Sequence, residues 1–180
     1  MKAIYAIVLC LLLGSAAQAQ VTGVSLQASG LTCSMCSKAV KNALEKVAFV
    51  DKVQVDIKNQ QYNLTFKAGQ TVDFDALSAA VEDAGFAVAT LKVTAQLPTP
   101  ATLQKDEHLQ IGGQTFHFLN AASQSVAGTV SFQLVDKSFV PAKEYRKWTA
   151  KSTMACVRTG RMAACCTRGA AEARIYHVII

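Results

Sequence analysis

The stretch GLTCSMCSKAVKNALEKVAFVDKVQVDIKNQQYNLTF, residues 30–66, changes its hydrophobic period and thereby decides the fold of the first half of the chain. Within residues 39–47 apolar side chains recur at helical spacing, which predicts an amphipathic helix. Residues 53–57 and 62–66 then alternate apolar and polar side chains, which predicts two half-buried strands in a hairpin.

The segments on either side complete a pattern of strands and helices. Residues 24–29 alternate as a strand, and Asp73 can cap a second helix that ends near Gly85, where a left-handed residue is wanted. Residues 86–93 supply a last strand. The order strand, helix, strand, strand, helix, strand predicts an α+β, ferredoxin-like domain with two helices on one face of an antiparallel sheet.

The two cysteines of the loop, Cys33 and Cys36, form a Cys-x-x-Cys pair before the first predicted helix. Cys36 falls in the first helical turn, with Ser34 as a plausible cap, and the partial positive charge of a helix start favours the thiolate that binds metal. The module contains no histidine, and Met35 is expected to face solvent. Soft thiolates without further ligands suit a two-coordinate ion, so Cu(I) is favoured, Hg(II) and Ag(I) are chemically similar, and Zn(II) needs a partner to complete its shell.

The quoted stretch, followed by LSAAVEDAGFAV at residues 77–88, resembles the heavy-metal-associated domain family. That family includes copper chaperones, amino-terminal domains of copper-transporting ATPases, and periplasmic mercury-binding proteins. The resemblance covers about residues 24–93 and implies the ferredoxin-like fold and metal binding through the two cysteines. Leu31 stands where relatives usually carry Met, a near-isosteric swap that should keep a buried loop anchor. Phe86 stands beside the loop, where relatives carry Lys, Tyr or Phe, and resembles the ATPase-type domains more than the lysine-bearing eukaryotic chaperones.

Two other uses of the cysteine pair remain open. A disulfide between Cys33 and Cys36 would close a very short loop and constrain little of the unfolded chain, although reversible oxidation would switch metal binding off. A thioredoxin-like oxidoreductase is the alternative from another class of function. That fold needs a cis-proline opposite the thiols, and no proline lies between Gln20 and Leu97.

The amino terminus is typical of a secretory signal peptide. Lys2 precedes the apolar run 4–13, and Ala17 and Ala19 occupy the small-residue positions of a cleavage site. The run is too short to span a bilayer, so cleavage is expected after Ala19, and residues 1–19 with Cys10 are removed. We therefore expect a periplasmic or otherwise exported protein with no membrane span.

Composition divides the mature chain into two expected domains, residues 20–95 and 105–180, joined by a linker at residues 96–104 that holds Pro98 and Pro100. Residues 20–95 carry seven Lys against seven acidic residues, whereas residues 96–180 carry ten Lys or Arg against five acidic residues. A basic excess can indicate nucleic-acid binding, but export removes most of that expectation.

The second half is predicted to be rich in strands. Residues 108–119 form two strands around Gly112 and Gly113, residues 128–136 form a third, and residues 173–180 form a fourth. Pro141 begins a short helix. Strands around one inserted helix predict a small β-rich domain, with an OB-like barrel as the candidate architecture.

A second candidate metal site lies in STMACVRTGRMAACCTRG, residues 152–169. Nearby arginines favour thiolates, and a disulfide from Cys156 to one of the later cysteines is the equal alternative in an exported protein. The three histidines are expected to be surface or core residues rather than ligands. The soft side chains of the candidate site are Met154, Cys156, Met162, Cys165 and Cys166.

The sequence as a whole predicts an exported metal-binding protein that sequesters or relays Cu(I), and not an enzyme. No Ser-His-Asp set, carboxylate pair or phosphate-binding glycine loop stands out. A mercury scavenger that feeds a membrane transporter is the alternative within the same class. The expected partners are the metal ion and a membrane metal transporter or another metal-binding protein.

Overall fold

The computed structural model describes residues 18–163 and 172–180. The predicted signal peptide therefore lies almost wholly outside the described residues. The elements, in chain order, are β1 (Gln20–Ser29), α2 (Ser34–Glu45), β2 (Val50–Asp56), β3 (Gln61–Phe66), α3 (Phe74–Asp83), β4 (Ala87–Leu103), β5 (Glu107–Ile111), β6 (Gln114–Phe118), β7 (Gln124–Leu134), α4 (Ala142–Thr149), α5 (Cys156–Thr159) and β8 (Ile175–Ile179). Within the described ranges, the helices are all too short or too polar to cross a membrane.

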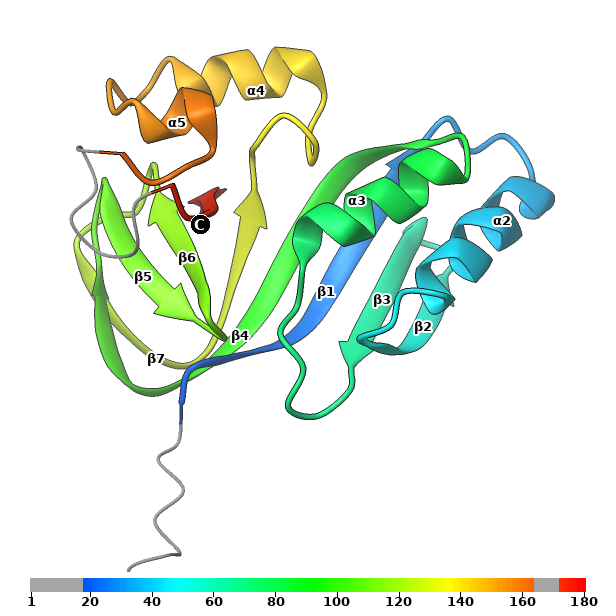
Figure 1. Ribbon diagram of the computed structural model, residues 1–180, viewed down its shortest axis with the longest axis horizontal. Helices are drawn as coiled ribbons and strands as arrows, with labels where there is room; N and C mark the ends of the chain where they lie inside the picture. Colours follow the sequence, from blue (N-terminus) through cyan, green and yellow to red (C-terminus); the bar gives the residue numbers. More distant parts are fainter. Residues whose placement is uncertain (1–17, 164–171) are drawn as a thin grey trace, which may run out of the picture.

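The first half has the expected ferredoxin-like order, with α2 and α3 on one face of β2, β3, β1 and β4 (Figure 1). Asp73 caps α3, because its carboxylate accepts the backbone N–H of Ala76 at 3.2 Å. Gly85 takes the left-handed conformation at φ 87°, as predicted. The α+β prediction and the helix positions are confirmed.

The second half extends the same sheet and does not close into a barrel within the described residues. The strand order is β2-β3-β1-β4-β7-β8-β6-β5, in which β6 and β8 are parallel and the other pairs are antiparallel. The expected OB-like barrel is therefore wrong. The reason is β4, which pairs with β1 along one edge and with β7 along the other, so the later strands add to an existing sheet (Figure 1).

Residues 96–104, expected as a linker, are almost wholly the second part of β4. The pairing of β4 with β7 shifts register between Leu97 and Ala101, the interval that contains both prolines. Proline has no N–H to donate to a sheet, so an irregularity at that point is its expected consequence. Pairing resumes at Ala101, opposite Val126. The separation of residues 20–95 and 105–180 into two domains stays a prediction.

One hydrophobic core runs through both halves. Side chains from β1, α2 and α3 belong to the same buried cluster as Phe116, Phe132 and Tyr176. The rings of Phe74 in α3 and Tyr176 in β8 meet edge to face, with centroids 5.0 Å apart. A smaller cluster under α4 and α5 holds Leu119, Val135, Val140, Cys156, Val157, Met162 and Ile175.

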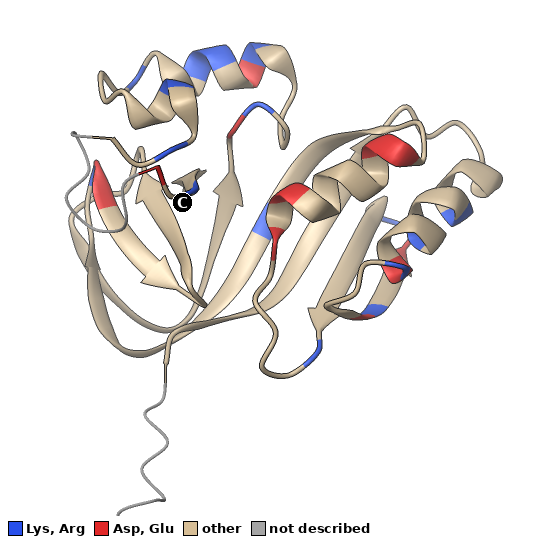
Figure 2. Cartoon of the chain, in the orientation of Figure 1, with Lys and Arg blue, Asp and Glu red and all other residues tan. Residues whose placement is uncertain are grey.

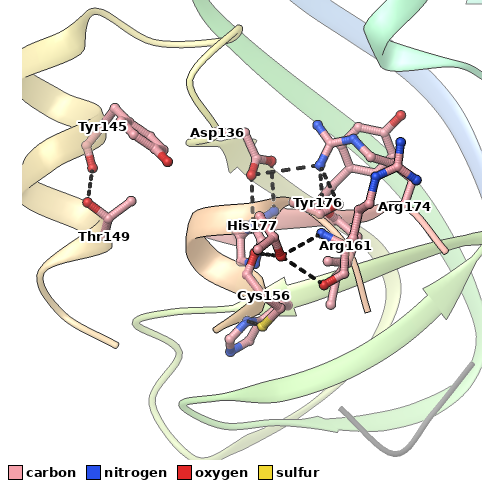
Figure 3. Close-up of polar contacts among 12 residues, drawn as sticks. Asp136, Tyr145, Thr149, Cys156, Arg161, Arg174, Tyr176 and His177 are labelled. Carbon is pink, nitrogen blue, oxygen red and sulfur yellow. Dashed lines mark hydrogen bonds and ion pairs between the residues drawn. The ribbon is translucent and has the colours of Figure 1, made fainter. Parts of the chain in front are cut away.

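A polar contact links the same two elements, α3 and β8. The guanidinium of Arg174 donates to both carboxylate oxygens of Asp75, at 2.7 and 3.0 Å, and the Tyr176 hydroxyl donates to the same carboxylate at 3.2 Å. Arg174 also lies 3.9 Å from Asp136 and over the Tyr176 ring, with Cζ 4.2 Å from its centroid (Figure 3). The two halves of the sequence are thus held together by apolar packing and by a bidentate ion pair between Arg174 and Asp75.

Candidate metal centre

The loop between β1 and α2 places the two thiols of the Cys-x-x-Cys pair together. Cys33 Sγ and Cys36 Sγ lie 2.9 Å apart, and both residues are free thiols. Cys33 is exposed and Cys36 is partly exposed. The two sulfur atoms therefore lie together at an accessible point, and they would move apart to hold one ion between them, because each metal–sulfur bond is about 2.3 Å long.

The helix start differs in one detail from the expectation. Cys33, not Ser34, is the N-cap of α2: its backbone is extended and its sulfur accepts the backbone N–H of Cys36 at 3.4 Å. This contact uses one of the N–H groups that a helix leaves without an internal partner. The first potential ligand is thus also part of the structure that begins the helix.

The local hydrogen bonds stabilise the anionic form of Cys36. The contact with the Cys33 side chain is the largest cause that lowers the pKa of Cys36, and the backbone of Thr32 is the next. Thr32 Oγ1 also lies 4.0 Å from Cys36 Sγ. A thiolate is the form that binds metal, so the loop favours the reactive state.

Contacts with β3 and with the hydrophobic core hold the loop in place. The Tyr62 hydroxyl on β3 lies 2.9 Å from Ser37 Oγ and 3.2 Å from the Ser37 carbonyl oxygen, which ties the first turn of α2 to the sheet. Leu31 and Phe86 both pack against the core while remaining partly exposed. Phe86 lies beside the loop as expected, since a Cβ on Gly30 would lie 3.8 Å from its ring. Leu31 contacts the core but is not the fully buried anchor that was expected, because it also lines an open groove.

The site opens to solvent. Met35, between the two cysteines, is 70% exposed, as expected. A groove of about 530 Å³ starts at Leu31 and Cys33 and runs along α2 toward the β2–β3 hairpin, where Ile57 is 85% exposed. An ion held here would be reachable by another molecule.

Among the described residues, no third His, Cys, Asp or Glu side chain is placed to share an ion with the pair. Within residues 18–163 and 172–180, the group of three or more His, Cys, Asp or Glu side chains placed to share an ion is His108, His117 and Cys156, on the opposite half of the sheet. The Cys33 and Cys36 sulfurs thus form an open two-ligand site in the described chain.

The second predicted site is only partly within the described residues. Met154, Cys156 and Met162 belong to the same small apolar cluster, where Cys156 is 0% and Met162 is 2% exposed. Cys165 and Cys166 lie outside the described residues. The assignment of these five side chains to one metal site stays a prediction.

The histidines near Cys156 were missed as candidate ligands. His117 is fully buried, and its Nδ1 lies 3.6 Å from Cys156 Sγ. Burial is the largest cause that lowers the pKa of His117 to about 4, and His108 and His177 contribute, so the ring is neutral at neutral pH. The predicted hairpin could have revealed one pair of them, because a two-residue turn at Gly112 and Gly113 places His108 directly opposite His117.

Comparisons with known proteins agree with the site geometry in the first half. The heavy-metal-associated domain model matches residues 25–87. The mercuric transport protein periplasmic component of Serratia marcescens is 40% identical over 63 residues, which cover 35% of this chain and 68% of that protein. Its counterpart from Pseudomonas aeruginosa is 38% identical over the same shares.

A solved structure, oxidized MerP from Ralstonia metallidurans, is 35% identical and covers 38% of this chain and 94% of that one, with a TM-score of 0.35. The identity and the coverage of the mercuric transport relatives, together with the matched family model, decide the classification. The chain therefore belongs to the heavy-metal-associated domain family, through the domain at residues 25–87.

Proposed function

We propose that this protein is an exported carrier of a soft metal ion, which it binds through Cys33 and Cys36 and then sequesters or passes on. The observation that carries the proposal is the pair of sulfur atoms 2.9 Å apart at an accessible helix start. Two thiolates without a third ligand among the described side chains suit an ion that accepts sparse coordination.

Cu(I) is the first candidate ion. It is soft, it binds thiolates strongly, and it tolerates two ligands, whereas zinc in a protein usually takes four. The lowered pKa of Cys36 supports loading at neutral pH, because less proton competition opposes the metal.

Hg(II) is the second candidate, and a specific observation favours it. The relatives that share 36 to 40% identity with this chain are mercuric transport proteins of the periplasm. Hg(II) and Cu(I) can both be bound by two thiolates without further ligands, so the geometry alone supports both ions. The signal-peptide pattern and the names of these relatives support an exported location.

Transfer to a partner is the step that an open site permits. A thiolate on a second protein can attack the bound ion while Cys33 and Cys36 remain attached, and then replace them one at a time. The exposed side chains of Met35, between the two cysteines, and of Ile57, which lines the groove, offer apolar contact for such a partner. A membrane metal transporter or another metal-binding protein fits this role, and no catalytic step is needed.

The proposal is tested by metal competition on the mature chain, reduced and handled without oxygen. Cu(I) is titrated against a coloured chelator, and Hg(II) against a competing small thiol. We expect one ion per chain held at the surface loop, and loss of that tight uptake in the double variant Cys33→Ser, Cys36→Ser.

Ser34→Ala is the matched control, because it changes one of the two residues between the cysteines and leaves both thiols in place. It should bind as the unaltered chain does. Equal affinity in the double variant and the unaltered protein would place the ion elsewhere and refute the proposal.

A further inference from the structure

Three histidines meet a cysteine inside the second half of the sheet. His108 on β5 and His117 on β6 are cross-strand neighbours with stacked rings, whose centroids are 4.4 Å apart. His177 on β8 is the register partner of His117 on the other side, with ring centroids 5.2 Å apart. Cys156, at the start of α5, completes the group through the 3.6 Å contact of its sulfur with His117 Nδ1. Side chains distant in sequence thus gather at one buried point.

Carboxylates orient two of the three rings. His117 Nε2 lies 3.1 Å from Asp106 Oδ1, which leaves Nδ1 directed to Cys156. His177 Nδ1 lies 2.6 Å from Asp136 Oδ1, and the other oxygen of Asp136 accepts the His177 backbone N–H at 2.9 Å (Figure 3). Histidines that bind metal commonly hold their second ring nitrogen against a carboxylate in this way.

The remaining ring nitrogens need an explanation. Nε2 of His108 and Nε2 of His177 are buried, and neither has a hydrogen-bond partner among the described residues. A buried polar atom without a partner is costly and uncommon, and an absent ion is one accepted reason for it. His108 is a member of the group, so its unpartnered nitrogen is an observation independent of the clustering that points to a ligand there.

We propose that His108, His117 and Cys156 form a zinc site in the second half of the sheet, with His177 packed against His117 beside it. The ligand atoms of the first three residues all lie within 4.8 Å of one another. Zinc bound at about 2.0 Å from nitrogen and about 2.3 Å from sulfur needs ligands closer together than this, so small inward movements complete the site.

The donor set separates this site from the surface pair. Imidazole suits zinc, and one thiolate among imidazoles matches the mixed nitrogen and sulfur sites that zinc occupies. The surface loop offers two sulfurs and an open approach, whereas this cluster offers a mixed set within the core. One site would carry an exchangeable ion and the other would hold a resident one.

A catalytic role is an alternative interpretation of the same residues, and it is less well supported than a metal site. Cys156, His117 and Asp106 have the order of a nucleophile, a base and an orienting carboxylate. Cys156 is 0% exposed, however, so a substrate has no access to the sulfur. An ion can instead be taken up as the chain folds, so burial of the sulfur does not exclude a metal.

The test uses the full mature chain with Cys33→Ser and Cys36→Ser, which removes the surface site. The result is therefore independent of whether the surface cysteines bind a metal as proposed above. The reduced protein is titrated with Co(II), and Zn(II) is then added in competition. We expect one Co(II) per chain, a thiolate-to-cobalt absorption band, and displacement of the cobalt by zinc. Cys156→Ser should remove the band, which distinguishes this thiol from Cys165 and Cys166.

The orienting carboxylate provides the sharper variant. Asp106→Asn should weaken Zn(II) binding by about 10- to 100-fold, because it removes only the group that orients His117. Glu144→Gln, a neutralised carboxylate on the surface of α4, is the matched control and should bind as the parent does. His108→Gln, at the partly exposed edge, should abolish binding while circular dichroism shows the fold retained.

Three results would overturn the zinc site. They are the absence of Co(II) uptake by the reduced parent, an absorption band that survives Cys156→Ser, and equal Zn(II) affinity in the parent, Asp106→Asn and His108→Gln.

Discussion

Cys33 is both the N-cap of α2 and a proposed metal ligand, and the capping contact restrains the position of its thiol. Its sulfur accepts the Cys36 backbone N–H, so the side chain that caps α2 is also a proposed ligand. Ser34, which the sequence favours as a cap, lies one residue inside the helix. A serine cap would leave Cys33 without this constraint.

The lowered pKa of Cys36 gives a pH prediction. Above its pKa a cysteine is a thiolate, so a lowered pKa keeps Cys36 reactive at a pH where an ordinary thiol is protonated. Alkylation of Cys36 by iodoacetamide, followed by mass spectrometry, should reach its half-maximal rate at a lower pH than for a model cysteine peptide. Cys33→Ser removes the side-chain contact with the largest effect and should move that midpoint upward. An unchanged midpoint would show that the neighbouring thiol does not stabilise the anion.

At the scale of elements, the hydrophobic period predicted the individual helices and strands of the first half well. It did not predict that β4 continues into the second half. The helices α2 and α3 and the β2–β3 hairpin follow from the spacing of apolar side chains, since each has one buried face. Pro98 and Pro100 predicted an exposed connection, yet β4 continues through them, because it tolerates an irregularity between two paired stretches. The pairing of β4 with β7 depends on residues far apart in the chain, which local patterns do not reveal.

The candidate sites show the same limit. The Cys-x-x-Cys pair is readable because both ligands lie three residues apart on one loop. The histidine cluster combines β5, β6, β8 and α5, and only its His108–His117 pair follows from a local hairpin. Its other members become visible only once the sheet order is known.

The contact between α3 and β8 predicts a measurable loss of stability. Asp75→Asn removes the charge that accepts both Arg174 bonds and the Tyr176 hydroxyl. Hydrogen bonds to charged groups contribute about 1.5–3 kcal/mol, and the partly exposed carboxylate places the expected loss in unfolding free energy near the lower end, about 1.5 kcal/mol. Urea denaturation measures it. Asp83→Asn, at the end of the same helix, is the control and should change little; an equal loss in both variants would contradict a specific role for Asp75.

At the scale of the whole molecule, charge and structure are distributed differently. The basic excess lies in residues 96–180, and Lys and Arg are prominent on α4 (Figure 2). The sheet and the main hydrophobic core nevertheless continue across both halves. A chain with two regions of different composition can therefore share one folded framework.

The shared core predicts cooperative unfolding. Trp148 in α4 is the single tryptophan of the chain, so its fluorescence reports on the second half, while hydrogen exchange of the α2 backbone amides, where Val40 and Leu44 are buried, reports on the first. In urea the Trp148 transition and the loss of exchange protection in α2 should share one midpoint, because Phe74 and Tyr176 pack in one cluster. Two separated midpoints would instead favour independent domains at residues 20–95 and 105–180.

The most direct test of the central claim is X-ray absorption on the reduced mature chain loaded with one equivalent of Cu(I). We expect a copper environment of two sulfur atoms, supplied by Cys33 and Cys36, and loss of that spectrum in the double serine variant. A spectrum dominated by nitrogen neighbours, or one unchanged in the double variant, would contradict it.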